Sequence, residues 1–93
     1  RRVGVDIEYR SDRIRRIASR FLRPDESAGS TDDLLTCWCV KEAVYKLRSA
    51  SHLAYDQMRV HLDTATADDL LAADSLSFGR EITADYVLVW TSE

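Results

Sequence analysis

The chain has 93 residues, of which 45% are hydrophobic and 31% charged, and its formal net charge is −3. This composition excludes an intrinsically disordered chain, which combines few apolar residues with a high net charge, and the length predicts one domain. No apolar run reaches the roughly 18–20 residues that span a bilayer, and no signal peptide opens the sequence. Because the first residue is Arg1 and a strand pattern begins two residues later, we expect a domain cut from a longer chain.

The only cysteines are Cys37 and Cys39, whose number and spacing fit neither a disulfide framework nor a zinc site. We interpret them as small apolar helix residues in a reducing compartment, which predicts a cytoplasmic location. Charge is uneven, because residues 1–23 hold eight arginines and three acidic residues, whereas the remainder holds five basic and thirteen acidic residues. The cationic segment indicates a local anionic partner rather than nucleic acid, although a solvated helix face explains it equally well.

The first half of the chain predicts one strand followed by two helices. Residues 3–8 alternate between apolar and polar side chains, which is the pattern of a strand with one apolar face. Apolar residues at helical spacing predict a helix over residues 12–23 and a second one from Thr31 or Asp32 to about Ser49. The apolar line of the second helix consists of Leu35, Cys39, Ala43 and Leu47, flanked by Val40 and Val44.

The second half predicts strands. Residues 58–62 alternate, residues 76–82 indicate a strand with a break or bulge at Gly79, and residues 86–90 form an apolar run suited to a central strand. Residues 50–57 are expected to form a loop, and residues 64–74 fit a short helix or a loop. The order of the elements predicts an α+β domain in which a small antiparallel sheet of three to four strands packs on the long helix.

Two carboxylates on the first strand are the first candidates for chemistry. Asp6 and Glu8 share a face because strand side chains alternate, and they lie about 6.6–6.8 Å apart along the strand. That separation lets both bind one hard cation through its ligands or waters. Gly4 lies on the same face and leaves room for a ligand at the backbone. The alternative is the exposed polar face of an edge strand.

On the long helix, Trp38, Glu42 and Lys46 are four residues apart each time, so they lie on one stripe. Glu42 lies in an otherwise apolar stretch, where a carboxylate can bind a metal ion or accept a proton near neutral pH. The alternative is a surface Glu–Lys pair, which stabilises a helix by only a few tenths of a kcal/mol.

Together, these two segments resemble the two signature motifs of the 4′-phosphopantetheinyl transferase superfamily. Its first motif reads G-[VI]-D-[IV]-E and matches residues 4–8; its second reads [WF]-x-x-K-E-A-x-x-K and matches residues 38–46. The segment around Arg20-Phe21-Leu22 and Glu26 is similar to the one between the motifs, and the run from Tyr86 is similar to the last strand. The resemblance therefore covers nearly the whole chain.

The Trp of the second motif and the Asp-Ile-Glu triplet resemble the larger, two-lobed Sfp-type members. The resemblance implies that residues 1–93 are one domain, the C-terminal lobe, and that an N-terminal lobe supplies the basic residues and the His that hold coenzyme A phosphates. His52 and His61 do not match that His, and we interpret them as ordinary loop or strand residues. A second lobe, upstream on the same protein or in another subunit, is thus an expected partner.

The reaction that the resemblance implies is transfer of 4′-phosphopantetheine from coenzyme A to a serine of an acyl or peptidyl carrier protein, releasing adenosine 3′,5′-bisphosphate. The carrier belongs to fatty acid, polyketide or peptide synthesis. Mg²⁺ would be held by Asp6, Glu8 and Glu42 and would neutralise the pyrophosphate. An alternative is a non-catalytic lobe that binds Mg²⁺–coenzyme A or a carrier, and a third interpretation is an acidic structural domain.

Within this interpretation, each remaining polar residue of the motifs has an expected role. Glu42 is the expected general base, with Glu26 as the weaker alternative. Lys46 would stabilise charge on the phosphate or protonate the leaving group. Lys41 lies about 100° around the helix from Glu42 and would contact coenzyme A or solvent. The arginine-rich helix at residues 12–23 would dock the acidic helix of a carrier protein.

Overall fold

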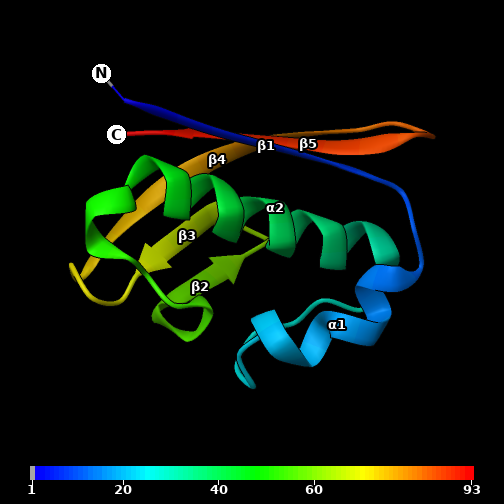
Figure 1. Cartoon of the computed structure of the whole chain (residues 1–93), viewed down its shortest axis with the longest axis horizontal. Helices are drawn as coiled ribbons and strands as arrows, with labels where there is room; N and C mark the ends of the chain where they lie inside the picture. Colours follow the sequence, from blue (N-terminus) through cyan, green and yellow to red (C-terminus); the bar gives the residue numbers. More distant parts are fainter. Residues whose placement is uncertain (1) are drawn as a thin grey trace.

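The computed structural model describes residues 2–93, in which a five-stranded antiparallel sheet carries a long helix across one face (Figure 1). Two short 3-10 helices connect the long helix to the second strand, η1 (Ser49–Ser51) and η2 (Tyr55–Gln57). The expected α+β class is confirmed, with one strand more than the three to four expected. The strands are β1 (Val3–Tyr9), β2 (Met58–His61), β3 (Thr66–Asp69), β4 (Asp74–Ile82) and β5 (Tyr86–Ser92), and the helices are α1 (Arg13–Phe21) and α2 (Thr31–Leu47).

The sheet order is β1-β5-β4-β3-β2, so the first strand of the chain forms one edge beside the last. The additional strand is β3, which lies in the segment expected to be a short helix or a loop. Its sequence, Thr-Ala-Asp-Asp, hides the alternation because the buried positions are Ala67 and Asp69. Asp69 tolerates burial because it accepts hydrogen bonds from the backbone N–H groups of Leu71 and Ala72 and forms an ion pair with Arg48.

β1 pairs with β5 over its full length, in a register that sets Asp6 opposite Val89 and Glu8 opposite Val87. These residues lie on the face that α2 covers. Gly4 lies on the same face, and a Cβ there would come 2.2 Å from the carbonyl oxygen of Ala43. The expectation that Gly4 leaves room for a ligand is therefore wrong, because the space is occupied by the α2 backbone.

Gly79 does not interrupt its strand. β4 continues in register with β5 through this position, so the expected break or bulge is wrong. Gly79 pairs with Trp90, and a Cβ on Gly79 would come 2.4 Å from the indole ring. The glycine is explained by the ring that lies over it rather than by a change in strand direction.

The core lies between the sheet and α2, where the predicted apolar line of the helix is buried as a whole. Ser30 caps α2 by accepting a hydrogen bond from the backbone N–H of Asp33. α1 packs on α2 through Ile14 and Phe21, both of which are buried. In the part of the chain that the structure describes, no helix has the length and apolar character needed to cross a membrane.

Candidate active site between β1 and α2

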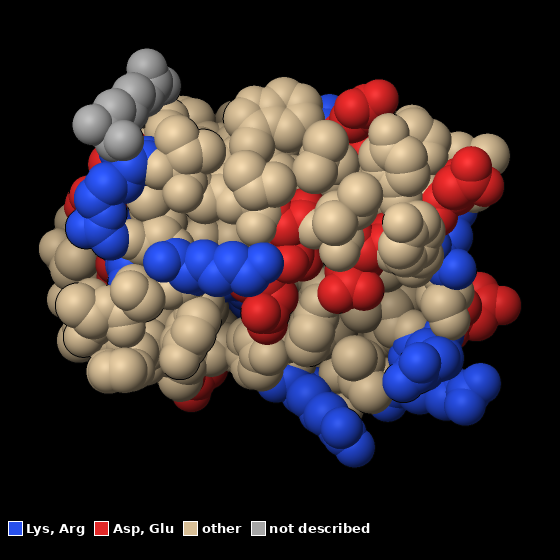
Figure 2. Space-filling view, turned by 45° about the horizontal axis from the view of Figure 1, so that its top comes forward, with Lys and Arg blue, Asp and Glu red and all other residues tan. Residues whose placement is uncertain are grey.

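The two sequence motifs meet in space, because β1 lies along α2 and each acidic residue of β1 contacts one residue of the helix stripe. Asp6 contacts Lys46, and Glu8 contacts Trp38. Acidic side chains gather near the middle of one face of the molecule, and several basic side chains project along its lower edge (Figure 2). The strand and the helix thus bring residues about 30 to 40 positions apart in sequence into one polar site.

Only one of the two carboxylate oxygens of Asp6 has a hydrogen-bond partner within the described residues. The Lys46 ammonium donates to Asp6 Oδ1 at 2.7 Å and to the carbonyl oxygen of Val5 at 3.1 Å. The hydrogen bond with Asp6 raises the pKa of Lys46, so the ammonium stays charged. Among the residues that the structure describes, the buried Asp6 Oδ2 has no hydrogen-bond partner. Burial and the nearby Asp6 raise the pKa of the Cys39 thiol, which therefore stays neutral.

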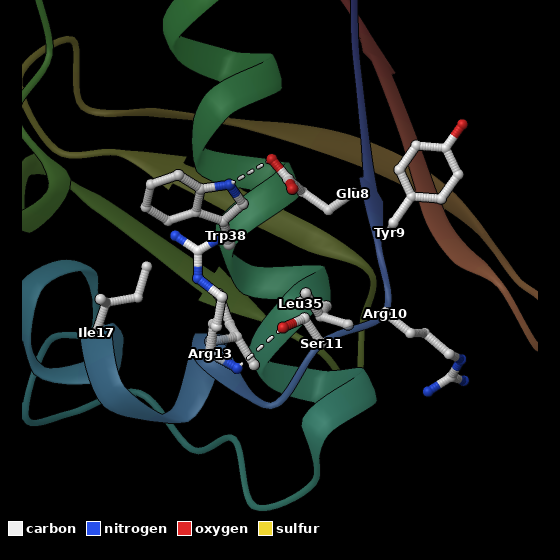
Figure 3. A pocket seen from close by; sticks show the side chains of 9 residues that line it. Glu8, Tyr9, Arg10, Ser11, Arg13, Ile17, Leu35 and Trp38 are labelled. Atoms are coloured by element: carbon white, nitrogen blue, oxygen red, sulfur yellow. Dashed lines mark hydrogen bonds between the residues drawn. The ribbon is translucent and has the colours of Figure 1, made fainter.

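Glu8 lies at the edge of a cavity of about 380 Å³ between the end of β1 and the two helices (Figure 3). Its Oε1 accepts a hydrogen bond from the indole Nε1–H of Trp38 at 3.1 Å. The Trp38 ring packs edge-to-face on Phe21, with the ring centroids 5.3 Å apart. Trp38 therefore both packs against the core and forms a wall of the cavity, which Arg13 also lines.

In the described chain, Glu42 bonds neither β1 nor another residue of α2 through its side chain, but a residue of η2. Its Oε1 accepts a hydrogen bond at 2.9 Å from the hydroxyl of Tyr55, a residue of η2. Desolvation, together with the hydrogen bond to Glu42, raises the pKa of Tyr55 to about 12, so the phenol remains a donor across the physiological range. Sequence reasoning missed Tyr55 because it lies in the segment that was expected to be a loop, outside both motifs.

The residues fit a magnesium site in kind but are not gathered into one. Carboxylate oxygens are the ligands that Mg²⁺ prefers. Within the described residues, the buried Asp6 Oδ2 has no hydrogen-bond partner and can therefore serve as one such ligand. Within residues 2–93, however, no three His, Cys, Asp or Glu side chains are grouped closely enough to hold a metal ion. In this side-chain arrangement Asp6, Glu8 and Glu42 each bond a different neighbour, and their joint binding of one Mg²⁺ ion stays a prediction.

Lys41 differs most from its expected role. Its side chain is fully buried and its ammonium donates to three oxygens: Glu26 Oε1 at 2.6 Å and the carbonyls of Phe21 at 2.6 Å and Tyr55 at 3.1 Å. Because an ammonium has three donors, none remains for a ligand. The expectation that Lys41 contacts coenzyme A or solvent is wrong.

Glu26 is the partner of that buried ammonium, and its side chain is also fully buried. It accepts hydrogen bonds at 2.7 Å from the backbone N–H groups of Arg23 and Val60. Its oxygens are thus used to connect the segment after α1 to α2 and β2. This position rules out Glu26 as the alternative general base, because it is inaccessible to a substrate.

The basic residues of α1 divide into paired and free ones. Arg15 bonds Thr31, whereas Arg13, Arg16 and Arg20 are exposed and form no ion pair within the described residues.

The two histidines are not part of the site. His52 follows η1 and is exposed, and His61 ends β2 and bonds Asp68 at 2.8 Å.

The family model of the 4′-phosphopantetheinyl transferase superfamily matches residues 2–90, almost the entire chain. The fold, the two motifs and this match together place the chain in that superfamily. No curated protein and no solved structure matches the chain significantly.

Proposed function

We propose that this chain is the C-terminal lobe of a 4′-phosphopantetheinyl transferase that modifies an acyl or peptidyl carrier protein. The observation that carries the proposal is the meeting of the two family motifs, in which Asp6 and Glu8 of β1 contact Lys46 and Trp38 of α2. The membership of residues 2–90 in the superfamily supports the reaction class.

In the proposed reaction, the serine hydroxyl of the carrier attacks the phosphorus that bears the pantetheine arm of coenzyme A. A new phosphorus–oxygen bond to serine forms, and the bond to adenosine 3′,5′-bisphosphate breaks. Glu42 accepts the serine proton, because a hydroxyl is a poor nucleophile without a base in hydrogen-bond reach. Lys46 stabilises the negative charge on the leaving phosphate.

Magnesium is the proposed cofactor, and Asp6, Glu8 and Glu42 are the residues that would hold it. When bound, Mg²⁺ supplies charge neutralisation of the pyrophosphate. The free Oδ2 of Asp6 supports its part in this set. Glu8 and Glu42 would join through their second carboxylate oxygens, while Trp38 and Tyr55 continue to hold the first ones.

We also propose that a second lobe, upstream on the same protein or from another subunit, completes the coenzyme A site. The sheet face opposite α2 supports this proposal, because its side chains are apolar and exposed in the described chain: Val3, Val5, Ile7, Tyr9 and Trp90. Exposed apolar patches of this kind mark interaction surfaces.

The buried Cys37 and Cys39, which form no disulfide, support the proposal of a reducing, cytoplasmic location.

A second candidate function is a lobe that binds Mg²⁺–coenzyme A or a carrier without catalysis. The observation in its favour is that Glu42, the proposed base, bonds Tyr55 rather than a residue of β1. Calorimetry of coenzyme A binding with and without MgCl₂, combined with a transfer assay, separates the two. We define the active assembly as this chain with any partner lobe that its activity requires. Transfer by the active assembly supports the transferase, binding without transfer supports the second candidate, and the absence of Mg²⁺-dependent binding overturns both.

A further inference from the structure

Tyr55 lies outside both motifs, yet it contacts residues of the second motif in three separate ways. Its hydroxyl donates a hydrogen bond to Glu42, and its carbonyl oxygen accepts one from Lys41. Its ring packs against Trp38, with the two ring centroids 5.6 Å apart. The residue follows α2 by eight positions, in the short helix η2. Tyr55 therefore contacts three positions of one motif, through its hydroxyl, its ring and its backbone carbonyl.

The hydroxyl contact concerns one oxygen of the expected general base. Tyr55 bonds Glu42 Oε1 at 2.9 Å, and in the described part of the chain Glu42 has no other hydrogen-bond partner. Glu42 Oε2 is therefore the oxygen that stays available for a proton or a cation. Without the phenol, the carboxylate of a partly exposed helix residue would be free to rotate.

The ring contact connects Tyr55 to the acids of β1. The Tyr55 and Trp38 rings are tilted by 35°, and the indole N–H of Trp38 bonds Glu8. Trp38 also packs edge-to-face against Phe21. Tyr55 thus supports the orientation of the indole that holds Glu8, in addition to its direct bond to Glu42.

The backbone contact fixes Tyr55 itself. Its carbonyl accepts from the ammonium of Lys41, whose charge is paired with Glu26 in the fully buried interior. Buried charge pairs are costly to disturb, so this anchor resists displacement of η2. A tyrosine anchored through its backbone can hold its hydroxyl in one place.

From these contacts we infer that Tyr55 is a positioning residue, whose hydroxyl holds the Glu42 carboxylate in the orientation needed for transfer and whose ring supports the Trp38–Glu8 pair. The inference rests on the proposed function, since it assigns the reaction's base and metal ligands to the residues that Tyr55 holds. It adds a residue that neither motif contains.

Tyr55→Phe tests the inference, because it removes the hydroxyl and keeps the ring. Tyr45→Phe is the matched control. Tyr45 lines, together with Glu42 and Tyr55, a second cavity of about 380 Å³ that is distinct from the one beside Glu8, but its hydroxyl bonds nothing in the described chain. In the active assembly we expect Tyr55→Phe to lower kcat about tenfold or more, as for loss of a hydrogen bond to a charged group. The KM values for coenzyme A and carrier should stay within about twofold, and Tyr45→Phe should change neither quantity.

A second measurement reports on Glu42 without turnover. Magnesium chloride is titrated into the full chain at constant ionic strength, with Trp38 emission as the signal in a Trp90→Phe background. We expect Tyr55→Phe to weaken Mg²⁺ binding several-fold, because a freely rotating carboxylate is a poorer ligand, and Tyr45→Phe to leave it unchanged. Thermal unfolding of both variants checks that the fold is intact.

The inference is overturned if Tyr55→Phe matches Tyr45→Phe in kcat and in Mg²⁺ binding. It is also overturned if the whole loss lies in the thermal midpoint or in KM, which would indicate a structural role only. Failure of the proposed function gives a different result, because the wild-type assembly would then show no transfer, or Glu42→Gln would transfer as fast as wild type. If Glu42→Gln abolishes transfer and Tyr55→Phe is as active as wild type, the function stands and this inference alone fails.

Discussion

At the scale of single residues, Lys46 occupies the position that a divalent cation would compete for. Its ammonium neutralises Asp6 at 2.7 Å, but the side chain is 53% exposed and therefore free to leave. An exposed ion pair stabilises by at most about 1 kcal/mol, which is small beside the attraction of a divalent ion for the same carboxylate. Departure of Lys46 from Asp6 would also release its charge for the phosphate in the proposed reaction.

Replacing Lys46 by Met is therefore expected to strengthen Mg²⁺ binding to the chain by about two- to fivefold, because the competing ammonium is gone. The same change should lower the transfer rate and weaken coenzyme A binding. Calorimetry with MgCl₂ measures the first effect, and Lys46→Arg, which keeps the cation, is the control. If the Met variant binds Mg²⁺ no better than the Arg variant, Lys46 does not compete for this site.

The same scale shows what the sequence predicts well and what it does not. Asp6 and Glu8 were placed on one face by strand alternation, and the structure has them there. The role of Lys41 was mispredicted, because its angle around the helix is known from sequence but the segment that covers it is not. Tyr55 gave no signal, since nothing local indicates that a residue of η2 reaches back to Glu42.

At the scale of elements, the buried pair of Lys41 and Glu26 connects three parts of the fold. Glu26, in the segment between α1 and α2, accepts from Lys41 of α2 and from the backbone of Val60 in β2. Both charged side chains are fully buried, so each depends on the other for its stability. This pair positions η2, and with it Tyr55, relative to the helix.

Lys41→Met is expected to lower the free energy of unfolding by about 3–5 kcal/mol, because it leaves the Glu26 carboxylate buried without its counter-ion. Urea unfolding followed by circular dichroism measures this loss. Adding Glu26→Gln to Lys41→Met should restore part of the stability, since no buried charge then remains unpaired. A Lys41→Met chain with wild-type stability and weakened coenzyme A binding would contradict the anchoring role.

The elements also show where the sequence pattern is informative. β1, α2 and β5 were predicted because their apolar periods are clear, and α2 packs on both of these strands. β3 was missed because a polar Asp69 takes an inward position, and its burial depends on Arg48, a residue far away in sequence. Gly79 was misread as a bulge because the ring of Trp90, which explains it, belongs to another strand.

At the scale of the whole molecule, charge is separated between the acidic site and the α1 surface. Arg13, Arg16 and Arg20 are exposed and have no acidic partner in the described chain, so α1 presents a free cationic face. We propose that this face attracts the acidic helix of a carrier protein. Such an interaction mainly increases the rate of encounter and sets the orientation of the partners.

Replacing these three arginines with Glu should raise the KM for the carrier and weaken its dependence on NaCl concentration, because the attraction is removed. The corresponding triple Gln variant should give an intermediate effect. Steady-state transfer at several salt concentrations measures both quantities. Unchanged KM and salt dependence in the Glu variant would show that carriers dock elsewhere.

We propose that carboxylates of β1 and α2 act together in phosphopantetheine transfer, and Glu42 is the most direct place to test this joint role. The measurement is the intact mass of a carrier protein after incubation with coenzyme A, MgCl₂ and the active assembly. We expect the carrier to gain one phosphopantetheine group with the wild-type chain and none with a folded Glu42→Gln chain. Modification by the Gln variant at the wild-type rate would contradict a role for the Glu42 carboxylate in transfer.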